Sequence, residues 1–261
     1  MNNQIIKKIA LEAVSLSAEK LKKEYFNFSR KQVKIKGRHE IVTKYDLMSE
    51  KIIIKKIKEH FPNHHILSEE QGDNQKKSDY LWIIDPIDGT TNFSIHNPLW
   101  SVSLALLYKN EIILGIILAP ILNELYIAEK NKGAFLNGKR IITPQINQEK
   151  AINTFCHGST KKDIKRAIKY YFHQKLNNLD CRQLGSATLE LAYVATGRVD
   201  SIVIPGAKPW DVVAGALIVS EAGGKVTDFS GKKWTIESPD ILASNKNNYQ
   251  EILKTIKKLK I

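Results

Sequence analysis

Cysteine is scarce in this 261-residue chain, which contains Cys156 and Cys181 and no others. The pair matches no zinc-ligand spacing and suggests no disulfide framework, so nothing in it indicates an oxidising compartment. Long hydrophobic runs are also missing. The longest, residues 112–122, is interrupted by Gly115 and Pro120 and is too short to span a bilayer. No continuous apolar segment near the N-terminus resembles a secretion signal. We therefore expect a cytoplasmic protein that has no membrane partner.

Acidic residues are fewer than basic ones. The chain has 27 Asp and Glu and 40 Lys and Arg, which gives a formal net charge of +13. Such an excess attracts anionic partners, either phosphorylated metabolites or nucleic acid. Many of the lysines stand in pairs such as 161–162 and 257–258, which is typical of a solvated surface. We favour this surface interpretation, and nucleic acid stays an alternative partner that the charge alone does not favour.

Hydrophobic periodicity divides the chain near a polar stretch at residues 144–150. The N-terminal part, residues 1–145, begins with two predicted helices and continues with a mostly antiparallel sheet whose hairpins turn at 109–110 and 137–138. The C-terminal part, residues 146–261, alternates predicted strands and helices. The apolar content of 43% is enough for a substantial core. We expect the two parts to pack intimately as one unit of the α/β (α+β) class.

The second predicted helix begins after a polar start signal. Thr43 or Asp46 is the candidate N-cap, because both side chains can accept a hydrogen bond from the first helical N–H groups. Leu47, Ile54 and Ile57 recur at helical spacing. They are expected to form the apolar face that packs on the sheet.

The strongest signal for chemistry lies in residues 81–93. The stretch begins with an apolar run that predicts a buried strand ending at Asp85, because Pro86 cannot donate to a sheet ladder. Open α/β sheets bind ligands beyond the carboxyl ends of their strands, so Asp85 and Asp88 are predicted to point into one cleft. A surface turn is the alternative, since Asp, Pro and Gly are turn residues. The buried lead-in and a similar carboxylate motif downstream favour the cleft.

Small and hydroxyl residues follow these two carboxylates. Gly89 lets the backbone approach a ligand closely, and Thr90 and Thr91 offer hydroxyl and N–H groups if a helix begins there. Carboxylates beside such donors suit a hard cation together with a phosphate group.

Two further acidic positions extend this pattern. Glu69 and Glu70 end a predicted short strand, and Asp211 follows Trp210 at the start of an apolar helix. Taken alone, Asp211 is simply a favourable residue in a first helical turn. Together with Asp85 and Asp88, however, these anions would repel one another and a phosphate in a cleft of low dielectric. Divalent cations would neutralise them, and all-oxygen ligands favour magnesium or manganese over zinc.

These residues carry a family resemblance. Residues 82–93 match the motif W-x-x-D-P-x-D-G-T-x-N-F in full, and residues 210–215 and 221–224 match W-D-x-x-A-G followed by E-A-G-G. The intervening pattern G-A-F-L-N-G-K-R at 133–140 agrees as well. Over essentially its whole length the chain resembles the inositol monophosphatase family of metal-dependent phosphatases. The resemblance implies a layered αβαβα fold of the sugar-phosphatase type.

The resemblance also implies the members of a site. It implies two or three Mg²⁺ ions per site, with Mn²⁺ as a possible substitute, whose ligands are Glu69, Asp85, Asp88, Asp211 and the carbonyl of Ile87. It implies catalytic roles for Glu69, Thr90 and Asp88, and it places Glu70 behind the ligands. It assigns substrate contacts to Gly89, Thr90, Gly185, Ser186 and Ala187. Family members are often homodimers.

The chain departs from the family pattern at two positions. Many inositol phosphatases carry a Glu that binds substrate hydroxyls where this chain has Ile204, whose side chain accepts no hydrogen bond. Glu40 replaces an Asp that is usual before the Val-Thr segment. The hydrolytic residues are therefore present, while a preference for inositol is in doubt.

These inferences predict a magnesium-dependent phosphomonoesterase that acts on a small phosphorylated polyol or sugar. Inositol 1-phosphate is the first substrate candidate. Fructose 1,6-bisphosphate, 3′-phosphoadenosine 5′-phosphate, NADP and histidinol phosphate are the alternatives. The alternative of another class is a basic protein that binds RNA or a transcription complex through its charged surface.

Overall fold

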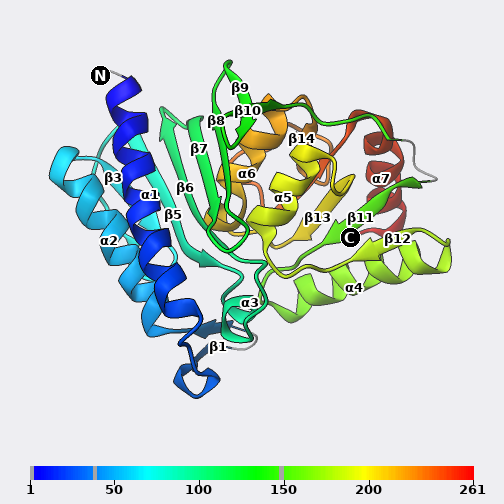
Figure 1. The fold of residues 1–261 in the computed structure, drawn as a ribbon. Coiled ribbons are helices and arrows are strands. Elements are labelled where there is room, and N and C mark those ends of the chain that lie inside the picture. Colours follow the sequence, from blue (N-terminus) through cyan, green and yellow to red (C-terminus); the bar gives the residue numbers. More distant parts are fainter. Residues whose placement is uncertain (1–2, 38–39, 147–149) are drawn as a thin grey trace.

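The computed structural model describes residues 3–37, 40–146 and 150–261. Two large sheets and the helices beside them form the layers of the molecule (Figure 1). The helices are α1 (Asn3–Tyr25), α2 (Lys44–His60), α3 (Thr90–Ser94), α4 (Lys161–Leu176), α5 (Ala187–Thr196), α6 (Pro209–Glu221) and α7 (Lys246–Leu259). A short 3₁₀ turn (Arg30–Gln32) and a small hairpin of β1 (Lys34–Gly37) and β2 (Glu40–Val42) follow α1.

The larger sheet has the strand order β10-β9-β8-β7-β6-β5-β3-β4. Its strands are β3 (His65–Ser68), β4 (Gly72–Asp73), β5 (Tyr80–Asp88), β6 (Ser101–Tyr108), β7 (Glu111–Ala119), β8 (Glu124–Glu129), β9 (Gly133–Leu136) and β10 (Lys139–Ile141). Neighbouring strands are antiparallel, except that β3 and β5 run parallel. Since β3 and β5 are parallel neighbours, their carboxyl ends lie at the same edge.

The smaller sheet has the order β12-β11-β13-β15-β14 and mixed directions. Its strands are β11 (Ile152–Phe155), β12 (Asp180–Arg182), β13 (Ser201–Pro205), β14 (Lys225–Thr227) and β15 (Asp240–Ser244). The central strand β13 runs parallel to β11 and antiparallel to β15.

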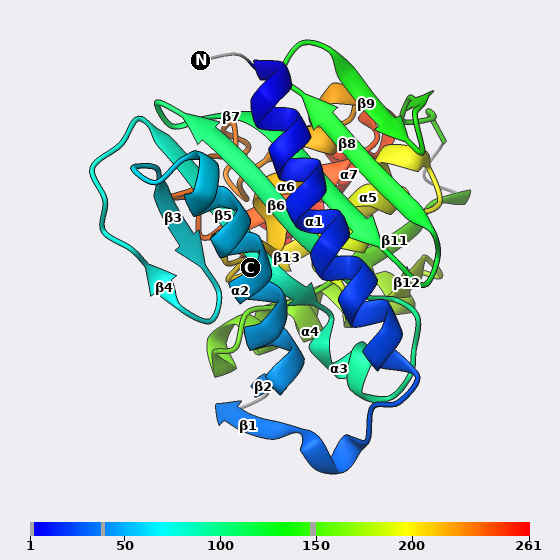
Figure 2. The same ribbon diagram turned by 60° about the vertical axis from the view of Figure 1, so that its left-hand side comes forward.

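Helices and sheets alternate in five layers. Helices α1 and α2 lie side by side across one face of the larger sheet (Figure 2). Helices α5 and α6 fill the space between the two sheets, and α4 and α7 cover the outer face of the smaller sheet (Figure 1). The predicted layered αβαβα fold is therefore confirmed.

A hydrophobic core lies between neighbouring layers. Ile9, Leu21 and Ile57 of the two N-terminal helices are buried against the larger sheet. Between the sheets, Leu191 and Val213 pack in a cluster that takes residues from both sides of position 145. The expected boundary at 144–150 lies partly outside the described residues. Within the described part of the chain, no helix combines the length and apolarity needed to cross a membrane.

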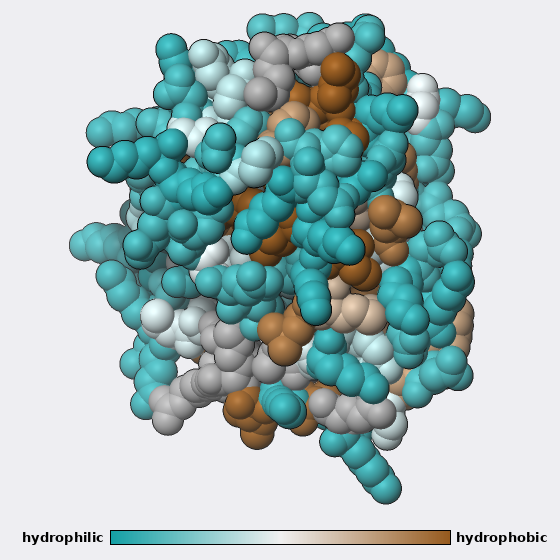
Figure 3. Space-filling model, turned by 90° about the vertical axis from the view of Figure 1, so that its left-hand side faces the viewer, coloured by the Kyte–Doolittle hydropathy of each residue, from teal (hydrophilic) through white to brown (hydrophobic). Residues whose placement is uncertain are grey.

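The outward face of α1 and α2 is mainly hydrophilic (Figure 3). Leu47, expected on the buried face of α2, lies here instead and is 52% exposed. The reason is that Asp46, Ser49 and Glu50 occupy inward positions of the first turns beside Tyr45, and the aliphatic part of the buried face begins at Ile53. The N-cap is Thr43, whose hydroxyl accepts a hydrogen bond from the backbone N–H of Tyr45.

Strand β5 is longer than the sequence predicts. It pairs with β6 up to Asp85, which lies opposite Ser103, and pairing resumes at Asp88 opposite Ser101. The prediction that the strand ends at Asp85 was therefore wrong. Pro86 does interrupt the ladder, because it has no N–H, but the extra residue is accommodated as a bulge. The bulge keeps Asp88 inside the sheet edge, where it is buried.

Candidate functional site

A cavity of about 260 Å³ lies where β3 and β5 end and where α5 and α6 begin. Six of the predicted site residues line it, namely Glu69, Asp88, Gly89, Gly185, Ala187 and Asp211. Asp85, Ile87 and Ser186 are buried. Thr90, the first residue of α3, follows Gly89 directly. Segments that are far apart in the sequence thus deliver the predicted residues to one place.

The carboxylates at this cavity repel one another electrostatically. Burial raises the pKa of Asp85 well above its usual value, and the negative charges of Glu69, Asp88 and Asp211 raise it further. Two effects therefore disfavour the charged form of Asp85, namely the loss of hydration and the repulsion by neighbouring anions. Asp85 has one local partner, because its Oδ1 accepts a hydrogen bond from the N–H of Ile87 at 3.1 Å.

The start of α5 holds the Asp88 carboxylate. Its Oδ2 accepts hydrogen bonds from the hydroxyl of Ser186 and from both the N–H and the hydroxyl of Thr188, the latter two at 3.0 and 2.6 Å. Its Oδ1 lies 3.2 Å from the N–H of Ala187. Burial raises the pKa of Asp88, and these donors act in the opposite direction. The structure thus places Ser186 against Asp88, so its hydroxyl orients that carboxylate.

Gly89 is required by its conformation and by its surroundings. Its φ is +87°, in the left-handed region. A Cβ atom at this position would lie 3.0 Å from the carbonyl oxygen of Leu99 and 3.1 Å from that of Gly185. The turn therefore brings the start of α3 close to the segment before α5, as the glycine in the motif predicts.

A polar face of α2 supports the site. The sequence reasoning identified Asp46 only as a candidate N-cap and did not assign Ser49 or Glu50. Asp46 Oδ1 lies 3.1 Å from the hydroxyl oxygen of Thr90, Ser49 donates to the carbonyl of Pro86 at 2.8 Å, and Glu50 accepts the N–H of Glu70 at 3.0 Å. All three side chains are buried. Polar residues at helical spacing i, i+3 and i+4 along an otherwise apolar face are the signal that could have revealed them.

Asp46 is the acidic member of this face that contacts Thr90. Burial raises its pKa to about 6, although hydrogen bonds from Thr43 and Thr90 act in the opposite direction and lower it. The hydroxyl of Thr90 also lies 2.9 Å from the carbonyl oxygen of Ile87. Two acceptors therefore fix the direction of the Thr90 hydroxyl hydrogen.

Glu190 of α5 is a second residue that the sequence reasoning did not assign. It is buried, and its Oε1 accepts the N–H groups of Leu184 and Gly185, both at 3.0 Å, and the thiol of Cys156 at 3.1 Å. Burial raises its pKa to about 7. Asn92 of α3 holds the same segment by donating to the carbonyl of Leu184 at 2.8 Å. These contacts fix the wall of the cavity that Gly185 forms.

The rest of the cavity lining is neither acidic nor uniformly polar. Ile204, at the position where many inositol phosphatases carry a Glu, is buried and lines the cavity. His157, Gln183 and Lys208 also line it. The other departing position, Glu40, begins β2, and its side chain lies outside the described part of the chain.

The residues that could hold a metal are carboxylates from separate elements of the fold. Within the described ranges, no three His, Cys, Asp or Glu side chains form a ready-made group for a metal ion. The donor chemistry nevertheless fits a hard divalent cation, because Glu69, Asp88 and Asp211 are carboxylates close enough to raise the pKa of Asp85. A cation among them would relieve the repulsion at Asp85.

The five-layered fold and this cavity at the strand and helix ends define a protein of the sugar-phosphatase type. Within that class the chain belongs to the inositol monophosphatase family, whose family model matches residues 2–260.

Named relatives agree with this assignment. The chain is 41% identical over 220 residues to a fructose-1,6-bisphosphatase/inositol-1-monophosphatase of Thermotoga maritima, covering 84% of each chain. It is 38% identical over 254 residues to the Nus factor SuhB of Pasteurella multocida, covering 95% of this chain and 94% of that protein.

Solved structures agree as well. The extragenic suppressor protein SuhB of Bartonella henselae superposes with a TM-score of 0.90 at 30% identity, covering 97% of this chain and 99% of that one. An inositol monophosphatase of Thermotoga maritima superposes with a TM-score of 0.87 at 34% identity, covering 99% and 98%.

Proposed function

We propose that the protein is a magnesium-dependent phosphomonoesterase acting on a small phosphorylated polyol or sugar. The observation that carries the proposal is the gathering of Glu69, Asp88 and Asp211 around one cavity, with Asp85 buried behind them. These four carboxylates and the Ile87 carbonyl would hold two or three Mg²⁺ ions, or Mn²⁺ in their place. Such ions polarise phosphoryl oxygens and stabilise a leaving alkoxide.

The protein's own groups bind the phosphate and orient the attacking water. The backbone of Gly89 and Thr90 faces the phosphate at the start of α3. The Thr90 hydroxyl, directed towards Asp46 and the Ile87 carbonyl, keeps an oxygen lone pair for a proton of the water. Glu69, which lines the cavity, accepts the other proton as general base. Glu70 supports Glu69 through its backbone contact to Glu50.

Inositol 1-phosphate remains the first substrate candidate, because the chain belongs to the family. The side chain of Ile204 offers no hydrogen bond to a polyol hydroxyl, whereas Lys208 and His157, which also line the cavity, suit an anionic group. This favours fructose 1,6-bisphosphate as the second candidate, and a relative is named for both activities. The nucleotide substrates 3′-phosphoadenosine 5′-phosphate and NADP, and histidinol phosphate, complete the candidates.

The test is phosphate release from these five esters with and without Mg²⁺. Asp211→Asn and Asp88→Asn should each lower kcat by about a hundredfold or more, because a ligand charge is lost. Asp79→Asn is the control, since Asp79 is an exposed residue outside the cavity. Release that is unchanged in both site variants would contradict the proposal.

A role in a transcription complex is the second candidate function. It rests on relatives named as Nus factors and on the net charge of +13. If it is the main function, RNA binding should survive Asp211→Asn and weaken steeply as salt is raised. Binding that is absent at low salt would exclude it.

We further propose that the protein forms a homodimer through α4. Ile168, Phe172 and Leu176 recur at intervals of four and are 55%, 62% and 67% exposed. Such an apolar stripe is typical of a contact between chains. Light scattering should find a dimer that Phe172→Lys dissociates. Phe26→Lys, which removes an equally exposed ring elsewhere, should leave the dimer unchanged.

A further inference from the structure

A second cavity, of about 320 Å³, lies at the opposite end of α6 from Asp211. The turn between β6 and β7, the turn between β8 and β9, the last turns of α6 and residues 226–236 enclose it. Among the residues that the structure describes, none lines both this cavity and the one that contains Asp211. Its volume is of the size that small-molecule sites have.

The floor of this cavity is apolar. Ala216 and Leu217 of α6 are buried beneath it, and Val226 and Trp234 close its sides. The indole ring of Trp234 is 6% exposed, and in the described part of the chain its Nε1–H has no hydrogen-bond partner. A buried donor without a partner is unfavourable, so this wall of the cavity leaves one hydrogen-bonding group unsatisfied.

Two lysines and two glutamates line the rim, namely Lys130, Lys233, Glu111 and Glu221. Lys130 forms an ion pair with Glu111. Glu221 accepts the backbone N–H groups of Asn131 and Gly133, both at 2.8 Å. Lys233 is exposed and makes no ion pair with any residue that the structure describes.

We propose that this cavity is a binding site for a small ligand with a flat apolar body and one anionic group. The body lies against Leu217 and the Trp234 ring, where burial of apolar surface favours it. The anion lies at Lys233, a rim cation that forms no ion pair with a described residue, although its charge also acts on Glu111. The site is separate from the proposed phosphatase centre and does not depend on that function.

The probe for the test is 8-anilinonaphthalene-1-sulfonate, an aromatic anion whose fluorescence rises on apolar surfaces, with uncharged N-phenyl-1-naphthylamine beside it. The wild-type protein should bind the anionic probe saturably at one site. Lys233→Ala should weaken that binding by about tenfold and leave the uncharged probe unchanged, since only the ion contact is lost. Lys232→Ala is the matched control, because Lys232 is an exposed neighbour that does not line the cavity.

A second variant tests the cavity itself. Ser220→Trp fills the mouth from the exposed last turn of α6 and should abolish binding of both probes, while circular dichroism shows an intact fold. Saturating inorganic phosphate with Mg²⁺ should displace neither probe. The proposal is overturned if binding does not saturate, if Lys233→Ala and Lys232→Ala behave alike, if Ser220→Trp still binds, or if phosphate displaces the probe.

Discussion

The hydroxyl oxygen of Thr90 lies 3.1 Å from Asp46 Oδ1, although the two residues are 44 positions apart. Asp46 stands in the first turn of α2 and Thr90 in the first turn of α3. The same turns of α2 hold the Pro86 carbonyl through Ser49. A helix on the outer layer thus sets the position of the segment that carries the proposed ligands.

This contact predicts a loss of activity when its geometry is changed. Asp46→Asn keeps the size of the side chain but can present an amide donor to Thr90, so the hydroxyl loses its fixed direction. We expect kcat to fall by about tenfold to a hundredfold with little change in KM. Thr90→Val should lower kcat at least as much, while Thr90→Ser should retain most of it. Equal activity of the Val and Ser variants would show that the hydroxyl has no role.

Glu190 predicts a pH dependence of stability. Its pKa of about 7 lies above the ordinary value of 4.5, so the folded state holds the proton more tightly than the unfolded state. The resulting stabilisation is fully present below pH 4.5 and is lost as the pH rises through 7. The free energy of unfolding should therefore fall by roughly 2–3 kcal/mol between pH 5 and 8, because each unit of pKa difference corresponds to about 1.36 kcal/mol.

Urea unfolding at several pH values measures this loss. Glu190→Gln does not titrate, so its free energy of unfolding should decline less between pH 5 and 8 than that of the wild type. Glu237→Gln, at an exposed position, is the control and should follow the wild-type profile. Parallel profiles for all three proteins would mean that Glu190 is already ionised at pH 5.

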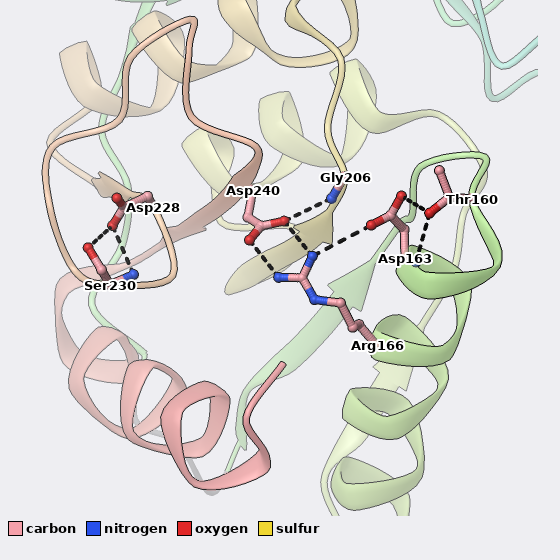
Figure 4. A network of polar contacts seen from close by, with 7 residues as sticks. All are labelled: Thr160, Asp163, Arg166, Gly206, Asp228, Ser230 and Asp240. Carbon is pink, nitrogen blue, oxygen red and sulfur yellow. Dashed lines mark hydrogen bonds and ion pairs between the residues drawn. The ribbon is translucent and has the colours of Figure 1, made fainter.

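An ion pair behind the cavity predicts an effect on substrate binding (Figure 4). Arg166 of α4 donates two hydrogen bonds to the Asp240 carboxylate, at 2.8 and 2.5 Å, and Asp240 Oδ1 accepts the N–H of Gly206 at 2.9 Å. Gly206 leads through the turn to Lys208, which lines the cavity. The pair therefore fixes the turn that carries a proposed substrate contact.

Arg166→Met should leave Asp240 largely buried without its partner. We expect a loss of about 2–3 kcal/mol in stability, somewhat below the range for fully buried pairs. KM should rise more than kcat falls, because the turn is displaced while the carboxylates stay in place. Lys165→Met, at the exposed neighbouring position, should change neither quantity. A fall in kcat alone would contradict this account.

Much of this site follows from local sequence, and the rest depends on contacts that local patterns do not encode. The run into Asp85, the glycine turn and the start of α3 are adjacent in the chain, so strand, turn and helix preferences locate them. The full length of β5 was missed because a bulge after Pro86 depends on the partner strand β6. The layered fold, by contrast, was predicted from the motif resemblance and is confirmed.

Asp46, Ser49 and Glu50 were missed for a related reason. Their partners lie 44, 37 and 20 positions away, so the spacing of the three residues could reveal the polar face but not its partners. Leu47 was placed inward for the same reason, because a hydrophobic pattern assumes that the inward positions of a helix are apolar. Glu190 resembles any acidic residue in a helix until the fold brings Leu184 and Gly185 to it.

Gly89 and Gly138 form a matched pair for the last prediction. Both adopt positive φ, +87° and +77°, so an alanine is strained at either position. At Gly138 a Cβ atom meets nothing within 4 Å, whereas at Gly89 it meets two carbonyl oxygens at 3.0 and 3.1 Å. Gly138→Ala should therefore cost only the backbone strain, about 1 kcal/mol, with activity unchanged.

Gly89→Ala should cost more, about 2–3 kcal/mol, because backbone atoms of Leu99 and Gly185 must shift in addition to the strain. The shift moves the Gly185 wall away from the proposed phosphate position, so we expect kcat/KM to fall by at least tenfold. Urea unfolding and phosphate release on both variants separate the two contributions. If the two alanine variants lose the same stability and keep the same activity, close packing at Gly89 has no part in the site.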